Sequence, residues 1–384
     1  MRQGHHPIAR GVLALAAAVA FIEAVLFSLL APLLPQFEKT LDLSGAGVGV
    51  LVAAYAIGAF AAAFPSIAIA KRIGVKPTVM IAFFVLAVAT LGLGFAESLP
   101  SVIASRFLQG VGSALGLTGA IAWLTGVTDR SLRAEAIGTA FSAAFAGALL
   151  GPVLGAAAAS LGRAVIFTAV AIGAAALGLM TLGLDPPSRS RTDETPPFTQ
   201  IFRDGTARVG IWLILVAGML LGVVGVLVPL QLDDLGWGAV AIGAVFATAA
   251  VIQMFASPRL GRFADSHGRV LVIRVALVAA ASMLVVLAID DYVWFYAVTA
   301  VAVAIAIGSL WTPSLALLAD TAEQRGFDQS TAAGLMNVAW APGFAIGGAV
   351  AGVLVAQLGN TLPCVLMSAV CLGSLALLRV ADVG

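Results

Sequence analysis

The feature that most constrains this chain is a series of twelve apolar segments, each long enough to cross a lipid bilayer as a helix. Hydrophobic residues make up 61% of the 384 residues and charged residues only 10%, a composition that soluble domains of this length do not have. The first segment is too long for a signal peptide, so we expect it to be a retained membrane helix. The twelve segments are expected near residues 12–34, 46–70, 77–96, 101–125, 135–158, 164–184, 209–231, 239–260, 270–289, 292–319, 330–357 and 361–380.

A single long polar segment, residues 185–208, divides the apolar segments into two sets of six. It is rich in Pro, Ser, Thr and charge, as linkers are, so we expect six-helix bundles at 1–184 and 209–384. The two halves also resemble each other, because an X-Pro-Leu sequence ends the first apolar segment at Pro32 and the seventh at Pro229. Internal repeats of this kind are typical of transporters. The predicted fold is therefore an all-α integral membrane protein of two pseudo-symmetric six-helix bundles.

The distribution of basic residues predicts the orientation. If both termini and the linker are cytoplasmic, 17 of the 20 Lys and Arg residues lie on the cytoplasmic side, as the positive-inside rule requires. We therefore expect a multi-pass protein of the cytoplasmic (inner) membrane, surrounded by the lipid bilayer and working as a monomer. With a net charge of +1, nothing indicates a nucleic-acid partner.

Glu23 is the one carboxyl group that lies deep in an apolar segment, twelve residues into the first. An acidic side chain at this depth can exchange a proton or pair with a cationic substrate, and such residues are functional by default. The alternative is a permanently protonated Glu23 that hydrogen-bonds to a neighbouring helix.

Arg106 lies inside the fourth segment, where a guanidinium group needs water or an acceptor. It could reach outward as a structural anchor. Alternatively it is a cavity charge that influences the protonation of Glu23, because the expected depths of the two residues differ by only about 5 Å at 1.5 Å per residue.

The fifth segment carries four glycines, Gly138, Gly147, Gly151 and Gly155, together with Pro152. The last three glycines recur every four residues, so they share one side of a helix and allow close approach of a neighbouring helix. Pro152 lacks an N–H group and is expected to kink the helix beside that contact.

These features resemble a known family, the major facilitator superfamily. The fifth segment resembles the antiporter motif of its 12-helix drug:proton exporters, and Arg106, Gln109 and Gly110 match its fourth-helix motif R-x-x-Q-G-x-G. Residues 261–269 resemble the signature G-x-x-A-D-x-x-G-R of its cytoplasmic loops, in which Asp265, Gly268 and Arg269 would form a latch. The first-half counterpart departs from that signature because Lys71 stands where the Asp belongs.

The first segment also resembles the vesicular amine transporter branch, in which an acid precedes a Pro-x-x-Pro sequence at the same spacing as Glu23 precedes Pro32. The second acid of that branch is replaced here by Gly308, so a mechanism with two acids is not implied. The fold of the family places further cavity candidates on helices that line its cavity. These candidates are Tyr55, Gln109, Gln253, Trp311, Asn337 and Trp340.

The resemblance implies a secondary transporter that exports small organic compounds, lipophilic or cationic, in exchange for protons by alternating access. It would need no cofactor, since the proton gradient drives it. One alternative is export of a neutral solute such as a sugar or nucleoside. A membrane enzyme is disfavoured because the apolar segments contain no buried His, paired acids or metal cluster. A sensor is disfavoured because we expect no soluble domain beyond the linker.

Overall fold

The computed structural model describes residues 7–129, 132–186, 203–289, 292–324 and 329–380. Throughout these ranges the ordered structure is helical. The elements are α1 (Pro7–Ser28), η1 (Ala31–Leu33), α2 (Leu34–Thr40), α3 (Gly45–Ile73), α4 (Val75–Gly94), α5 (Leu99–Val127), α6 (Arg133–Leu161), α7 (Arg163–Met180), η3 (Thr181–Gly183), α8 (Gly205–Asp234), α9 (Ala239–His267), α10 (Arg269–Ile289), α11 (Val293–Gln324), α12 (Gln329–Leu358) and α13 (Thr361–Val380).

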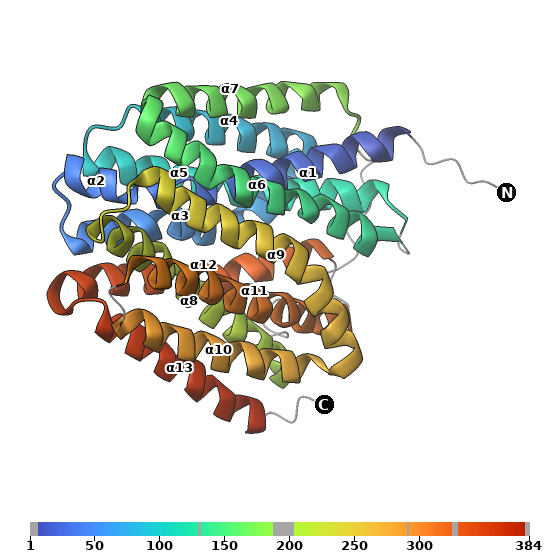
Figure 1. Ribbon diagram of the computed structural model, residues 1–384. Coiled ribbons are helices and arrows are strands. Elements are labelled where there is room, and N and C mark those ends of the chain that lie inside the picture. Colours follow the sequence, from blue (N-terminus) through green and yellow to red (C-terminus); the bar gives the residue numbers. More distant parts are fainter. Residues whose placement is uncertain (1–6, 130–131, 187–202, 290–291, 325–328, 381–384) are drawn as a thin grey trace.

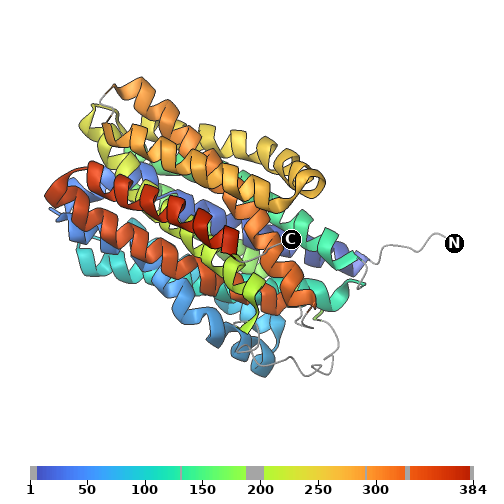
Figure 2. The same ribbon diagram turned by 90° about the horizontal axis from the view of Figure 1, so that it is seen from below.

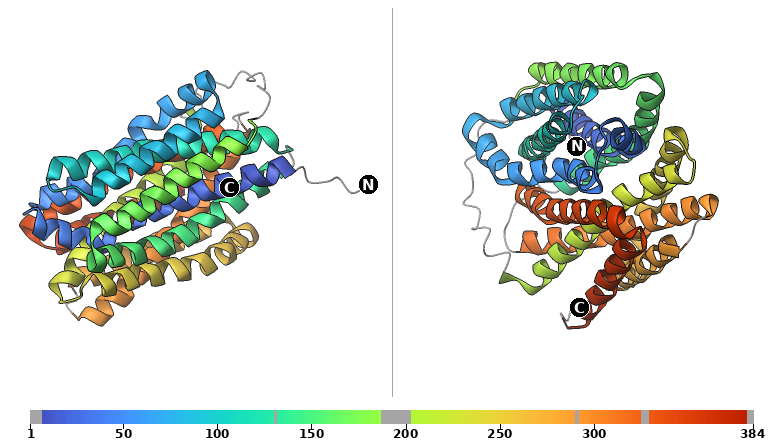
Figure 3. Two further views of the ribbon diagram at one scale, coloured as in Figure 1. Left: turned by 90° about the horizontal axis from the view of Figure 1, so that it is seen from above. Right: turned by 90° about the vertical axis from the view of Figure 1, so that its left-hand side faces the viewer.

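Within the described residues, twelve helices are long and apolar enough to cross a membrane, which confirms the predicted fold class. The helices run roughly along one direction in Figure 1, with α1 to α7 in the upper part of the view and α8 and α10 to α13 in the lower part, while α9 passes from beside α3 and α6 to the lower right. Figure 2 shows the same bundle from below, and the right-hand view of Figure 3 looks along the helices. We call the end at the left of Figure 1 the α2 end, and the end where α1 begins and α13 finishes the termini end.

The first membrane span is broken near its end, where the sequence predicted one helix to residue 34. Helix α1 stops at Ser28, the chain turns through η1, and α2 then continues to Thr40. Pro32 and Pro35 lie in adjacent turns, and each removes a backbone donor. Pro35 occupies the first turn of α2, where its missing N–H costs nothing. Helix α8, which contains the single Pro229, continues through it.

The turns between helices repeat from one half to the other. The described residues with positive φ fall into three pairs: Asp42 with Gly236, Gly74 with Gly268, and Gly162 with Gly359. The first pair joins the first and second spans of each half, the next joins the second and third, and the last joins the fifth and sixth. Five of these six residues are glycine, which adopts positive φ without a steric penalty. A positive φ at matching turns supports the pseudo-symmetry expected from the sequence.

Glycines bring helices within each half into backbone contact. A methyl group added to Gly147 or Gly155 of α6 would collide with the carbonyl oxygens of Phe21 and Leu29, while one added to Gly151 would meet the side chain of Ser28. These glycines therefore pack against the first span, as small-xxx-small helix contacts do.

The second half uses the same device between α12 and α8. A methyl group on Gly343 or Gly347 would collide with carbonyl oxygens of α8, and one on Gly218 or Gly222 would collide with carbonyl oxygens of α12. Helices α6 and α12 are the fifth spans of their halves, and each packs its glycines against the first span of its own half.

Glycines also join the two halves, near the α2 end. On α3, Gly45 and Gly49 face Gly348 and Gly352 of α12. A methyl group added to Gly45, Gly49 or Gly352 would overlap the backbone of the opposing helix. A second contact lies between α6 and α9, where a methyl group on Gly243 would come within 2.9 Å of the Pro152 carbonyl oxygen. We call these two contacts the inter-half seams.

Replacing Gly151 with Leu tests the packing of α6 on the first span. The larger side chain would overlap Ser28 and the Val25 carbonyl oxygen, and overpacking costs about 1–3 kcal/mol or more. We expect a lower yield of folded protein and a lower Tm in detergent. Gly173→Leu on α7 is the matched control, because a methyl group there meets no atom within 4 Å. Equal Tm values for the two variants would contradict the packing role.

Candidate functional site

Glu23 lies on α1 and is hydrogen-bonded to α5. The Ser113 hydroxyl donates to Oε1 of Glu23 over 2.5 Å. Ser113 is buried, whereas Glu23 is half-buried. The carboxyl group therefore has one oxygen fixed by a neighbouring helix, while the residue as a whole is not completely enclosed by protein.

Arg106 lies two turns before Ser113 on α5 and also binds the first span. Its Nη1 donates to the Leu26 carbonyl oxygen and to Oε1 of Gln109, both over 2.9 Å. Leu26 is in the last turn of α1, where carbonyl oxygens lack partners within the helix. A cation near a helix C-terminus is also favourable to the helix dipole. Gln109 is held in turn by a hydrogen bond of 3.1 Å from Nε2 to Thr90 Oγ1.

The described contacts do not join Arg106 directly to Glu23. The guanidinium group is 1% exposed and lies 4.7 Å from the ring centre of Tyr55. Its hydrogen bonds go to Leu26 and Gln109 instead. These contacts favour the reading of Arg106 as an anchor of α1, and its expected influence on the protonation of Glu23 stays a prediction.

An aromatic cluster connects this site to the second half. Phe27 lies one turn beyond Glu23, and its ring centre is 5.6 Å from that of Tyr55, 5.8 Å from that of Trp340 and 5.0 Å from that of Phe344. The first two contacts are edge-on and the third is tilted, and aromatic pairs at these distances are stabilising. Because Trp340 and Phe344 lie on α12, this mid-span cluster joins the two halves.

The remaining cavity candidates lie in the second half. Asn337 is buried and accepts a hydrogen bond of 2.8 Å from Trp340 Nε1, so these two belong to the aromatic cluster. Gln253 on α9 donates to Ser257 over 2.7 Å and lies against the backbone of Gly308 on α11. Trp311 is half-buried and packs against the apolar core.

The residues expected to pack or gate are placed as follows. Gly110 lies against the backbone of Tyr55, whereas a methyl group at Gly138 would meet no atom within 4 Å. Gly268 forms the turn between α9 and α10, and Arg269 begins α10. The side chain of Asp265 lies outside the described part of the structure, so the expected latch stays a prediction.

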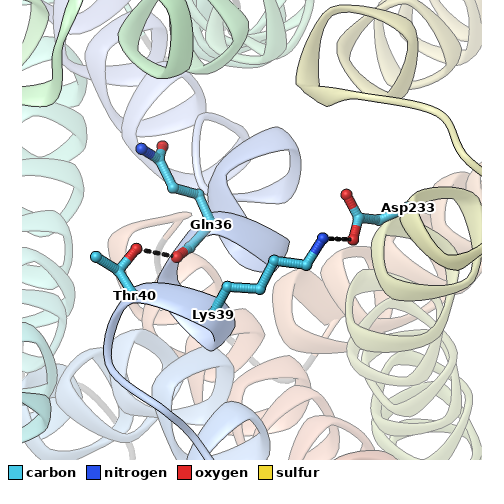
Figure 4. A network of polar contacts seen from close by, with 4 residues as sticks. All are labelled: Gln36, Lys39, Thr40 and Asp233. Atoms are coloured by element: carbon cyan, nitrogen blue, oxygen red, sulfur yellow. Dashed lines mark hydrogen bonds and ion pairs between the residues drawn. The ribbon is translucent and has the colours of Figure 1, made fainter.

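At the α2 end an ion pair spans the two halves. Lys39 Nζ on α2 lies 2.5 Å from Asp233 Oδ2 at the end of α8, and Figure 4 shows this pair. Close to it, Thr40 donates to the Gln36 carbonyl oxygen. The same four residues line a pocket of about 250 Å³ together with residues of α6 and α9. Lys39 is 69% exposed, so the pair alone contributes little to stability.

Sequence reasoning missed Ser113 and Phe27. A signal for Ser113 was present, because it lies four residues after Gln109 and seven after Arg106, on the same face of the helix. Phe27 lies four residues after Glu23 by the same rule. Neither residue is charged, so neither stands out in an apolar segment. In the described part of the chain, no three His, Cys, Asp or Glu residues are grouped so that they could hold a metal ion.

The sequence matches the family model of the Major Facilitator Superfamily over residues 16–327 and, in a second match, 211–383. The chain belongs to the Major Facilitator Superfamily. This family and the twelve membrane-length helices among the described residues point to a transporter. No curated protein matches the sequence significantly.

Solved structures of superfamily transporters have the same fold. A bacterial homologue of the human lysosomal transporter Spinster, inward-facing and occupied, aligns with a TM-score of 0.78 at 16% identity, covering 99% of this chain and 98% of its own. The inward-facing, unoccupied form gives a TM-score of 0.71 at 15% identity, with 98% and 96% covered. The human organic anion transporter MFSD10 (TETRAN) gives 0.70 at 16% identity, with 97% and 100% covered.

Replacing Arg106 tests its role as an anchor of α1. Arg106→Ala would leave the Leu26 carbonyl oxygen without its donor, and a hydrogen bond to a charged group contributes about 1.5–3 kcal/mol. We expect a lower Tm, with partial recovery in Arg106→Lys, which keeps the charge but loses the planar fork. Arg259→Ala is the control, since this exposed arginine bonds only its own helix in the described contacts. An unchanged Tm in Arg106→Ala would exclude the anchor.

Proposed function

We propose that this transporter exports small organic, lipophilic or cationic compounds in exchange for protons. The observation that carries the proposal is Glu23, a half-buried carboxyl group in the middle of the first span. In this position it can bind either a proton or a cation, so the two compete for one site. Competition of this kind couples proton entry to the exit of the cargo when only the occupied site changes from one side of the membrane to the other.

The choice of a cationic cargo rests on which charge is accessible. Arg106 is 1% exposed and its guanidinium group is held by α1, Gln109 and the Tyr55 ring. Glu23 retains exposure, and the Phe27 cluster beside it offers ring faces, which attract cations. One structural relative, MFSD10, is by name an organic anion transporter. An anionic cargo would require an accessible cation in place of Glu23.

A neutral cargo, such as a sugar or nucleoside, is the second candidate. It is favoured by the Asn337 amide, which lies beside Trp340 and could contribute hydrogen bonds within an aromatic surface. Glu23 would then bind only protons. A competition experiment with a cationic probe distinguishes the two candidates. If the cargo is cationic, the probe and protons compete for Glu23. If the cargo is neutral, Glu23 binds only protons and the probe does not displace the cargo.

We also propose that the α2 end faces the outside and is closed in this conformation. The inter-half seams and the Lys39–Asp233 pair all lie at or near that end. At the termini end, methyl groups on Gly138 and Gly261 would meet no atom within 4 Å. Most of the basic residues lie toward the termini end, which supports a cytoplasmic location for it. The Spinster homologue structures, which have the same fold, are described as inward-facing.

Glu23→Gln tests the proposed coupling. Glutamine has nearly the same shape but cannot titrate, so we expect folded protein with no cargo-driven proton movement. Everted vesicles with a pH-sensitive dye, screened with tetraphenylphosphonium and other organic cations, provide the measurement. Glu135→Gln, an exposed acid at the start of α6, should behave as wild type. Normal proton release in Glu23→Gln would exclude Glu23 as the coupling residue.

Gly352→Ala tests the proposed closure of the α2 end. The added methyl group would overlap the Gly45 carbonyl oxygen and force α3 and α12 apart. The reporter is a cysteine introduced at Val52, which is buried against Gly348, in a protein from which the two buried native cysteines have been removed. With Gly352→Ala, a reagent added from outside should alkylate this cysteine several-fold faster than without it. Gly225→Ala is the control, because a methyl group there has no neighbour within 4 Å. Equal labelling in both variants would exclude the seam as a closure.

A further inference from the structure

Ser113 differs from most hydroxyl residues in the helices of this protein. Thr125, Ser309, Ser314 and Ser374 each donate to the carbonyl oxygen four residues earlier in their own helix. This is the usual behaviour of a hydroxyl group in an apolar helix. Ser113 instead donates across to α1, where it binds Glu23 Oε1 over 2.5 Å. A hydroxyl group has one hydrogen to give, so Ser113 gives its hydrogen to the carboxyl group.

The position of Ser113 on α5 fixes the rotation of the carboxyl group. Arg106 and Ser113 lie on the same face of α5 and bind α1 at Leu26 and Glu23, which are three residues apart. Two bonds from one helix face therefore hold the last turns of α1. Ser113 is buried and binds Oε1, whereas none of the described hydrogen bonds goes to Oε2 of Glu23.

The other groups near Glu23 leave this role to Ser113. The titratable or charged groups nearest to Glu23 are Tyr55 on α3, whose buried phenol faces Ser113, and Arg106 on α5. Arg106 is bound to α1 and Gln109. Helices α6 and α7, which also contact α1, carry charged residues only near their ends.

We infer that Ser113 positions Glu23 for proton exchange, by holding Oε1 so that the exchangeable proton is carried on Oε2. The serine keeps its hydrogen in both states: the proton binds to Oε2 and leaves from the same oxygen, and no bond to Ser113 is broken. Ser113 is thus a positioning residue and not a proton carrier. The inference rests on the proposed function only in taking Glu23 as the group that titrates.

Infrared difference spectroscopy between acidic and alkaline pH tests this without knowledge of the cargo. The purified protein should show a carboxyl C=O band that is absent in Glu23→Gln. In Ser113→Ala this band should move to higher frequency, because the C=O group loses its hydrogen bond. Ser113→Thr keeps the hydroxyl group and should restore the original position. Ser105→Ala, a buried serine on the same helix, should leave the band unchanged.

The outcomes separate the two proposals. A Glu23 band that does not move in Ser113→Ala would overturn the positioning role while leaving Glu23 as the titrating residue. The absence of any band that depends on Glu23 would overturn the titration itself, and the inference with it. Should Ser113→Ala not fold, Ser113→Cys keeps the volume with a much weaker donor and should shift the band in the same direction.

As a second readout, proton release driven by tetraphenylphosphonium should fall about tenfold in Ser113→Ala. A tenfold fall is the lower end of the range expected when one hydrogen bond to a charged group is lost. Release that stays at the wild-type rate in Ser113→Ala would overturn the inference.

Discussion

The structure depends on backbone-close contact between helices, which glycine alone allows. Within each half, the fifth span packs its glycines against carbonyl oxygens of the first span, α6 on α1 and α12 on α8. Between the halves, Gly45 and Gly49 meet Gly348 and Gly352 in the same way. In lipid no hydrophobic force drives helices together, so close van der Waals packing must supply the attraction. A contact without side chains can also separate without breaking strong bonds, which suits an interface that opens and closes.

The glycine contacts determine what the polar residues can do. Because α6 is held against the first span on one side, Arg106 and Ser113 on α5 can bind it from another. The two bonds have different roles. Arg106 satisfies a carbonyl oxygen that the broken end of α1 leaves free, which is structural. Ser113 holds the carboxyl group that we propose to exchange protons.

Much of the fold could be predicted from the sequence, because membrane spans are defined by length and apolarity. The twelve spans follow from that rule, and the match between Pro32 and Pro229 indicated the repeat. The break after Ser28 was not expected, since two prolines in adjacent turns act differently from the single Pro229 in α8.

The site was predictable in its charged members and not in its neutral ones. Glu23 and Arg106 stand out because ionisable residues are rare in spans. Their actual partners depend on how α1 and α5 are rotated about their axes, which periodicity does not determine. Ser113 and Phe27 are ordinary residues in an apolar segment, and only the packing of α1 against α5 and α12 shows their importance. Gly138 shows the reverse case, since it shares the motif of Gly147 but lacks a neighbour.

Transport across the membrane requires that the two halves move as units, so that closing one end opens the other. Distances between spin labels measure this directly, with one pair at the α2 end on Thr40 and Ala239 and another at the termini end on Lys71 and Arg262. Adding tetraphenylphosphonium or changing the pH should lengthen one distance and shorten the other. The α2 end, which we propose is closed, should give the shorter distance in the conformation described. Two distances that stay constant, or that change in the same direction, would contradict the account.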